Sequence, residues 1–381
     1  LFISGTFLNI VARFTGLKKS FIEAVFYKPP LFMKKVQSLW IACLLLVGLS
    51  TLNAQDIHFS QFYMSPLNLN PAMTGVMNCN IRLAANYRNQ WASALRSNAY
   101  STYSVSYDQR VPVGRNDYFG VGGTFWGDRA GEANFATLTG KLSLSYSKKM
   151  GGGRNDGHYL VFGAEGGVAQ RSIDFLKLRW GTQHDGEGGF DPDLESQELG
   201  FDRDNFIFAD MAAGLLWFMV FDKDNNLYLG GSFHHLNRAN QSFDSEGEDL
   251  LYSRFTVHGG GEFMLGDRFG ITPGVIVMSQ GPSFQVNAGT GFKFLLGSRQ
   301  NYQAFQFGLW TRISNKIETG VLNDAAILST RFDYDSFSLG FSYDINVSPL
   351  KPATNSNGGF EFALIYKICG PERRGVYCPN F

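Results

Sequence analysis

The chain has 381 residues, of which 44% are hydrophobic and 17% are charged, and its 33 Lys and Arg residues balance its 33 Asp and Glu residues. The apolar content excludes a disordered chain, and the zero net charge argues against a nucleic-acid-binding protein. The longest apolar run, Leu39–Leu52, has 14 residues, fewer than the roughly 20 that a membrane-spanning helix needs. The 44 glycines and the 15% of aromatic residues favour an all-β protein instead.

Residues 33–54 have the three-part pattern of a secretory signal peptide. Lys34 and Lys35 form a basic start, residues 39–49 form a short apolar stretch, and Ala54 ends a segment of small and polar residues. The alternative is a buried helix of a soluble domain, but the basic start and the short apolar stretch favour export.

The mature protein is expected to begin near Gln55. Lipidation at Cys43 is disfavoured, because Trp40 stands where a lipobox has Leu. Residues 1–32 precede a natural start and begin with Leu rather than Met. We expect this stretch to be upstream read-through without a structural role.

From residue 80 onward, apolar and polar residues alternate along the chain, most clearly over 337–343 and 360–368. A period of two places alternate side chains on opposite faces of a strand. Many of the alternating segments have 10 residues or more, the length of a tilted membrane-spanning strand. About fourteen strands are predicted: 80–88, 98–109, 117–126, 134–148, 158–171, 206–221, 226–235, 252–265, 268–279, 284–296, 303–313, 325–334, 336–347 and 358–369.

The connections between these strands are mostly long and short in turn. The long ones are 127–133, 172–205, 236–251, 314–324 and 346–357, and the short ones are 222–225, 266–267 and 335. Two exceptions are 149–157, which is long, and 280–283, which is short. Alternating lengths are typical of outer-membrane barrels, whose periplasmic turns are short. The sequence therefore predicts a single antiparallel transmembrane β-barrel over 80–369, with its polar residues facing the lumen and both termini in the periplasm.

No sequence signature of a metal site, a catalytic nucleophile or a phosphate-binding loop is present, so neither a cofactor nor enzymatic activity is expected. His234 and His235 are adjacent on a predicted strand, so we expect their side chains to point to opposite faces. The acidic residues of 185–204 could bind Ca²⁺, but their spacing does not match an EF-hand and a solvated outer loop is the simpler interpretation.

Three cysteines remain after the predicted signal peptide. Cys79 precedes the first predicted strand, Cys369 ends the last, and Cys378 lies in the tail. The first and last strands of a closed barrel are neighbours, so Cys79 could form a disulfide with Cys369 or with Cys378 in the oxidising periplasm.

Several motifs resemble the PorP/SprF family. They are Gln55-Asp56-Ile57-His58-Phe59-Ser60-Gln61-Phe62-Tyr63, Pro66-Leu67-Asn68-Leu69-Asn70-Pro71-Ala72 with Gly75, Asn86-Tyr87-Arg88-Asn89-Gln90-Trp91, Ser104-Val105-Ser106-Tyr107-Asp108, and Tyr377-Cys378-Pro379-Asn380-Phe381, which is similar to a Cys-Pro-x-Phe ending. Asn380 departs from the basic residue expected there. The resemblance implies an outer-membrane component of the type IX secretion system of Bacteroidetes.

The resemblance also implies a role and partners. Members of this family assist the export or surface attachment of large proteins, including gliding adhesins, and are associated with a periplasmic lipoprotein ring and a peptidoglycan-binding protein. Outer-membrane lipid and a secreted cargo protein complete the expected partners. The alternatives are a porin or ligand transporter that uses an open lumen, and an outer-membrane enzyme, which no motif supports.

Two segments flank the predicted barrel, namely residues 55–79, either a periplasmic segment or a plug, and the periplasmic tail 370–381. Both hold aromatic or basic residues that suggest contacts rather than spanning strands. We expect a partner-docking surface on the periplasmic side, although the same residues could instead plug the barrel mouth. The candidate docking residues are Phe59, Phe62, Tyr63, Asn68, Asn70, Pro71, Arg373, Arg374, Cys378, Pro379 and Phe381.

Overall fold

The computed structural model describes residues 56–114, 116–153, 156–184, 189–191, 193–195, 202–222, 224–297, 302–316, 320–370 and 378. The expectations for residues 1–54, and for most of the tail, fall outside this part of the chain. Within it, no helix is long and apolar enough to cross a membrane.

The described residues form fourteen β-strands. Their bounds are β1 (Ile81–Gln90), β2 (Tyr100–Val113), β3 (Asp117–Ala130), β4 (Phe135–Gly151), β5 (Gly157–Ser172), β6 (Asn205–Val220), β7 (Asn226–His234), β8 (Arg254–Met264), β9 (Phe269–Gln280), β10 (Ser283–Leu295), β11 (Gln303–Asn315), β12 (Val321–Tyr334), β13 (Phe337–Asn346) and β14 (Asn357–Ile368). The helices are short: η1 (Phe62–Met64), α4 (Pro66–Leu69), η2 (Pro71–Met73), α5 (Ala92–Leu95), η3 (Arg96–Asn98), η4 (Phe175–Lys177), η5 (Gly181–Gln183) and α6 (Lys351–Thr354).

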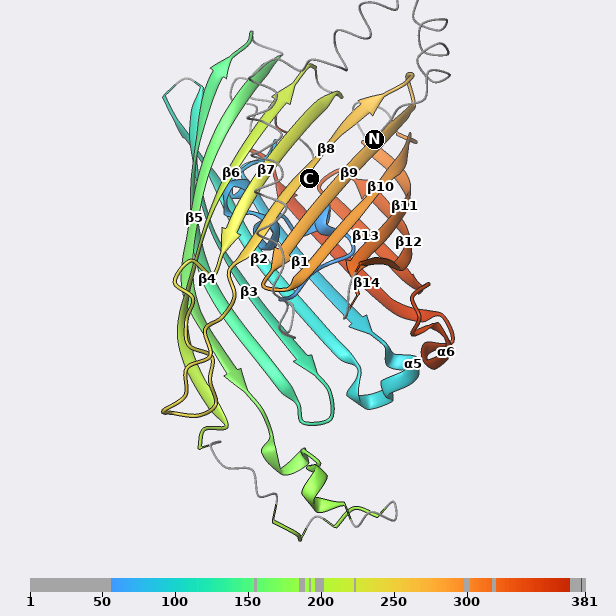
Figure 1. Cartoon of the computed structure of the whole chain (residues 1–381). Coiled ribbons are helices and arrows are strands. Elements are labelled where there is room, and N and C mark those ends of the chain that lie inside the picture. The colour runs from blue at the N-terminus through green and yellow to red at the C-terminus, as the bar shows by residue number, and fades with distance from the viewer. Residues whose placement is uncertain are drawn as a thin grey trace, which may run out of the picture. The chain divides into compact units, whose positions relative to one another are not determined.

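The strands close into one antiparallel barrel (Figure 1), in which each strand pairs with its neighbours in the chain and β1 pairs with β14. The closing pair is in register along its full length, from Ile81 opposite Ile368 to Gln90 opposite Gly359. Closure gives every strand two partners, which a sheet needs where lipid cannot hydrogen-bond to its backbone. The prediction of a single barrel of about fourteen strands is confirmed.

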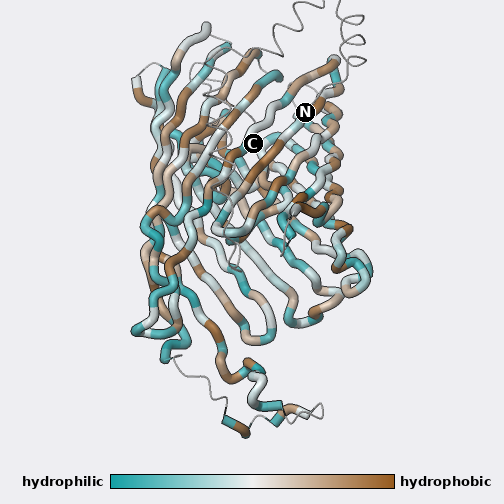
Figure 2. The backbone as a smooth tube through the Cα atoms, viewed as in Figure 1, coloured by the Kyte–Doolittle hydropathy of each residue, from teal (hydrophilic) through white to brown (hydrophobic). Residues whose placement is uncertain are grey.

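Residue hydropathy changes repeatedly along the strands (Figure 2), and the burial pattern places the apolar side chains on the outer face. On β13, Phe337, Leu339 and Phe341 are exposed on the outer face, while Ser338 and Ser342 are buried inside. The predicted orientation of the last two strands agrees with this burial pattern. An outward apolar band is what a lipid environment requires of a barrel.

The two ends of the barrel differ. At one end, here called the turn end, β1 begins, β14 ends and adjacent strands are joined by short connections such as 335–336. At the other, the loop end, the connections include 173–204, 235–253 and the segment that carries α6, which lie at the bottom of Figure 1. The predicted alternation of long and short connections is therefore present, although β12 begins four residues before the predicted 325 and shortens one loop.

Residues 56–79, here called the plug, run through the lumen. Asp56 contacts the loop-end residues His235 and Gln280. Asn80, which follows the plug, donates its backbone N–H to Ile368 at the turn end. The segment thus crosses the barrel interior lengthwise, and of the two placements left open by the sequence the structure has the plug.

Candidate functional site

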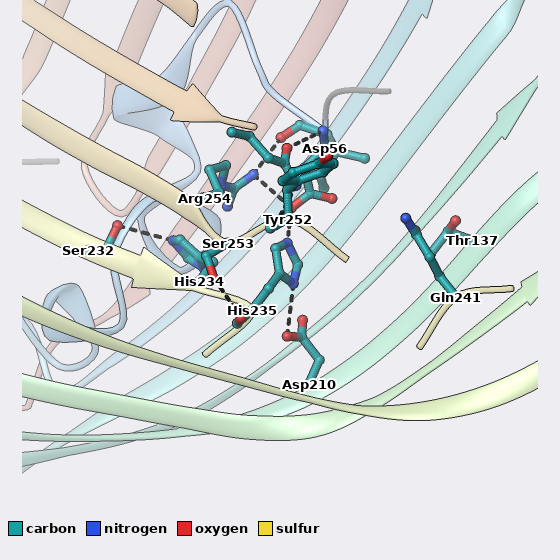
Figure 3. A network of polar contacts seen from close by, with 12 residues as sticks. Asp56, Thr137, Asp210, Ser232, His234, His235, Gln241, Tyr252, Ser253 and Arg254 are labelled. Atoms are coloured by element: carbon teal, nitrogen blue, oxygen red, sulfur yellow. Dashed lines mark hydrogen bonds and ion pairs between the residues drawn. The ribbon is translucent and has the colours of Figure 1, made fainter. Parts of the chain in front are cut away.

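The first plug residue is held at the loop end by a chain of charged groups (Figure 3). His235 lies between two carboxylates, with Nε2 2.9 Å from Asp56 and Nδ1 2.9 Å from Asp210. Arg254 contacts the same Asp56 carboxylate at 2.9 Å, and Lys141 contacts Asp210 at 2.8 Å. Because all five side chains are largely withdrawn from solvent, these contacts are stronger than the same pairs would be on a surface.

Two groups of this cluster, Asp56 and His235, lie outside the strands, and the neighbouring charges shift their pKa values. Burial alone would raise the pKa of Asp56, but the charges of Arg254 and His235 outweigh it and hold that pKa well below its usual range. Burial alone would lower the pKa of His235, but Asp56 and Asp210 outweigh it and raise that pKa. The cluster therefore favours an ionised Asp56 against a protonated His235.

A second polar cluster holds the plug four residues further along the chain, at Ser60 and Gln61. The backbone N–H groups of Ser60 and Gln61 both donate to the Glu361 carboxylate, at 2.7 and 2.9 Å. The Ser60 hydroxyl donates to Asp344 at 2.8 Å, and Arg312 contacts that same carboxylate at 2.7 Å. Glu361 of β14 thereby satisfies two plug backbone N–H groups, and Asp344 of β13 satisfies a plug hydroxyl, which would otherwise be buried without partners.

Asn70 fixes the middle of the plug against three strands. Its amide nitrogen donates to the Leu215 and Gly231 carbonyl oxygens at 3.1 and 3.2 Å and lies 3.0 Å from the His258 ring. Its side-chain oxygen accepts from the backbone N–H of Ala72 and so caps η2. One fully buried side chain thus joins the plug to β6, β7 and β8.

Glycines in the wall let the plug backbone come close. A Cβ atom at Gly163 on β5 would lie 2.3 Å from the Ala72 nitrogen, and one at Gly120 on β3 would lie 2.1 Å from the Thr74 carbonyl oxygen. No side chain fits at either distance, so glycine is required where η2 and the following residues press on the sheet.

A buried ion pair holds the plug toward the turn end. Arg82 contacts Asp108 at 2.8 Å and donates to the Met73 carbonyl oxygen at 3.0 Å. The Asp108 carboxylate accepts from the backbone N–H of Gly75 at 2.7 Å. Both members of the pair are fully buried, and each gains a plug hydrogen bond that a bare pair would lack.

The turn-end half of the inner face of β5 and β6 is apolar rather than polar. Tyr159, Val161, Leu216 and Phe218 are buried in one cluster with plug residues that include Met73. This corrects the expectation that the lumen-facing residues are polar throughout. The physical reason is that this part of the wall faces the apolar side of the plug and not water.

Cys79 forms a disulfide with Cys369. The bond joins the last plug residue to the residue that follows β14. Cys378 is a free, buried thiol whose backbone N–H donates to Asn78 at 2.5 Å and whose sulfur lies 3.5 Å from the Tyr118 hydroxyl. The structure therefore has one of the two pairings that the sequence left open.

Most of the described docking candidates are inside the barrel. Phe59, Phe62, Asn70, Pro71 and Cys378 are buried, and the other two are half-buried: the Tyr63 hydroxyl donates to Ser329 and the Asn68 amide to Ser104. Arg373, Arg374, Pro379 and Phe381 lie outside the described residues.

The expectation of one periplasmic surface built from residues 55–75 and 370–381 needs correction. Asp56 and Ser60 lie toward the loop end, whereas Gly370 follows β14 at the turn end. Asp56 and Ser60 therefore lie at the opposite end of the barrel from Gly370. The physical reason is that the plug crosses the lumen instead of staying beside the first strand.

The histidine pair also differs from the prediction. His234 ends β7, and His235 has a left-handed backbone with φ of +57°. This conformation breaks the strand alternation, so both rings are buried, with centroids 6.4 Å apart. Among the described residues no group of three His, Cys, Asp or Glu side chains is arranged to hold a metal ion. Asp185, Glu187 and Glu198 of the acidic loop lie outside those residues.

A closed antiparallel barrel with an apolar outer face and a chain segment through its lumen defines the class of outer-membrane β-barrels with an internal plug. Residues 51–366 match the family described as type IX secretion system membrane protein PorP/SprF, and the chain belongs to this family. No curated protein sequence matches the chain.

Several solved barrels are distantly similar. The toluene transporter TbuX of Ralstonia pickettii has 10% identity and a TM-score of 0.43, with 81% of this chain and 94% of that chain covered. CdiB from Escherichia coli has 9% identity and a TM-score of 0.42, with 74% of this chain covered. This chain spans 63% of the length of that CdiB chain.

Proposed function

We propose that the protein is a non-enzymatic component of the type IX secretion system that assists the export or surface attachment of secreted proteins, such as gliding adhesins. The observation that carries the proposal is the plug. Charged and polar contacts join it to strands on all sides of the lumen, including β2, β8, β13 and β14. A barrel filled in this way acts through its surfaces and not as an open passage for cargo.

The alternative function, a porin or ligand transporter, requires a continuous polar lumen. Plug residues Gln61, Asn70 and Thr74 are each fully buried between the plug and the wall. Buried groups at three successive depths show that the plug packs against the wall along the length of the lumen. The packing therefore favours the secretion role over the transport role.

We infer that the loop end faces the cell exterior and that the turn end faces the periplasm. Short periplasmic turns are the rule for barrels of this type. In this orientation the periplasmic partners, a lipoprotein ring and a peptidoglycan-binding protein, would meet the turn end. The exposed Asn78 and Asn80 and the tail with Arg373 and Arg374 would form the contact surface, while Cys378 anchors the tail.

The test removes the tail and measures three quantities. A variant lacking residues 371–381 is compared with the intact protein. The three quantities are the barrel level in the outer membrane, the co-purification of periplasmic proteins from the native envelope, and the display of the secreted cargo. We expect a normal barrel level, with co-purification and cargo display both lost.

A point variant separates docking from assembly. Arg373→Ala combined with Arg374→Ala removes two charges from the tail, and Lys148→Ala removes a half-exposed charge elsewhere at the turn end. The first variant is expected to lose partner proteins and the second to keep them. Normal cargo display after complete removal of the tail would refute the docking role.

A further inference from the structure

A cavity of about 250 Å³ remains beside the plug in the turn-end half of the lumen. The plug leaves it open because η2 packs against β4, β5 and β6, whereas the cavity is lined by strands from β7 round to β14. Asn226, which begins β7, and Asp335, in the turn between β12 and β13, mark its opening at the turn end.

Part of the cavity lining is charged, and one of its basic side chains, Lys367, has no ion-pair partner among the described residues. Lys293 pairs with Glu262 at 2.5 Å, and Arg331 pairs with Asp333 at 2.9 Å. Lys367 also lines the cavity, and among the described residues no carboxylate lies within ion-pair distance of it. The remaining carboxylate, Asp335, is exposed in the turn. A single negative charge entering the cavity would therefore compensate Lys367.

The same cavity also has aromatic residues in its lining, further from the turn end. Phe62 and Tyr63 from the plug and Trp310 from β11 line it, with the Tyr63 and Trp310 rings stacked at 5.3 Å. The hydroxyl oxygen of Thr272, also at the cavity, is buried without a hydrogen-bond partner in the described structure. A flat apolar group would fit against the rings, and a polar atom next to it would satisfy the hydroxyl.

We propose that this cavity binds a carboxylate attached to an apolar, preferably aromatic, group. Lys367 pairs with the carboxylate, and the rings of Phe62, Tyr63 and Trp310 hold the apolar group. Such a carboxylate occurs both in free aromatic acids and at the carboxyl end of a peptide chain. Because two of the rings belong to the plug, an occupied cavity also ties the plug to β9–β14.

The experiment titrates three probes into the purified full-length protein in lipid nanodiscs, with ligand-observed NMR as the readout. N-acetylphenylalanine represents a peptide end, 3-phenylpropionate represents a free acid, and N-acetylphenylalaninamide lacks the carboxylate. Saturable binding of at least one acid is expected, with the amide roughly tenfold or more weaker. Binding of the first acid alone identifies a peptide end as the source, and binding of the second alone identifies a free acid.

Two variants change the site at different residues. Lys367→Met removes the charge, and Gly274→Leu fills the space, because a Cβ atom there already lies 3.3 Å from the Trp310 ring. Both should lose binding while keeping the heat-dependent gel mobility of a folded barrel. Lys148→Met, at an ion pair outside the cavity, should bind like the original protein.

Bound acid should also raise the temperature at which the barrel unfolds, since a ligand that binds only the folded state stabilises it. Equal binding of acid and amide, unchanged binding by Lys367→Met, or the absence of saturable binding by both acids would each overturn the proposal.

Discussion

At the residue scale, His235 shows how a single backbone conformation changes which groups meet. With strand geometry its ring would point away from His234 and out of the lumen. Its left-handed φ instead turns the ring between Asp56 and Asp210. Alternation in a sequence indicates strand geometry alone, so it could not predict this contact. The polar residues Asn237 and Arg238 that follow are consistent with an early end to the strand.

From the contact of His235 with Asp56 we predict that the plug is bound less tightly at the loop end as pH rises. The folded-state pKa of His235 is raised above its ordinary 6.5. The contribution is therefore complete below about pH 6.5 and is lost as pH increases through the raised value. Hydrogen exchange of residues 56–62, corrected for intrinsic rates, should show protection that decreases over this range.

The matched variant is His235→Gln, which removes the titrating group but keeps a polar side chain. Its plug protection should be lower by roughly 1.5–3 kcal/mol at pH 6 and should change little with pH across the same window. If the original protein and the variant have the same pH dependence, His235 is not the group that controls the plug.

At the element scale, the strands follow from the sequence and the plug does not. Strand β5 spans Gly157–Ser172 and was expected over 158–171, because a period of two is a direct consequence of having two different faces. The plug has no such period. Its aromatic, Asn and Pro residues suit packing inside a lumen and docking to a partner equally well, and only the surrounding wall decides between them.

The close fit of plug and wall gives a prediction for β5. Gly163→Val would place side-chain atoms within about 2.3 Å of the Ala72 nitrogen, so η2 must move from the wall. We expect a loss of a few kcal/mol, in the range of about 1–3 kcal/mol or more found for overpacked cores, measured as a lower unfolding temperature together with faster exchange of residues 70–76.

Gly166→Val on the same strand is the control, because a Cβ atom there meets no other atom within 4 Å. It should leave both measurements unchanged. Comparable damage from the two substitutions would mean that valine disturbs β5 itself and not its contact with the plug.

At the scale of the whole molecule, the chain closes on itself twice near the same place. The pairing of β1 with β14 completes the barrel, and the Cys79–Cys369 disulfide joins the residues just outside that pair. A bond between residues so distant in sequence restricts the unfolded chain strongly. It also ties the end of the plug to the last strand.

The disulfide predicts a specific pattern among cysteine variants. Cys79→Ser, Cys369→Ser and the double variant should each lose about 2–5 kcal/mol of stability, and the three losses should be equal because they remove one shared bond. Cys378→Ser should retain the disulfide. The measurement is the temperature at which each variant loses the gel mobility of the folded barrel, with and without reductant. A reductant-sensitive Cys369→Ser variant would instead indicate pairing of Cys79 with Cys378.

The plug fills the lumen, and ion conductance in planar lipid bilayers measures whether the barrel is closed. The intact protein should show no steady open channel, whereas a variant lacking residues 56–77, which retains Cys79 and is first shown to be a folded barrel by heat-dependent gel mobility, should conduct steadily. Asp56→Ala should give brief openings, because it releases the loop-end contact while the contacts of Asn70 and Arg82 remain. A steady open channel in the intact protein, equal to that of the variant without the plug, would contradict the account.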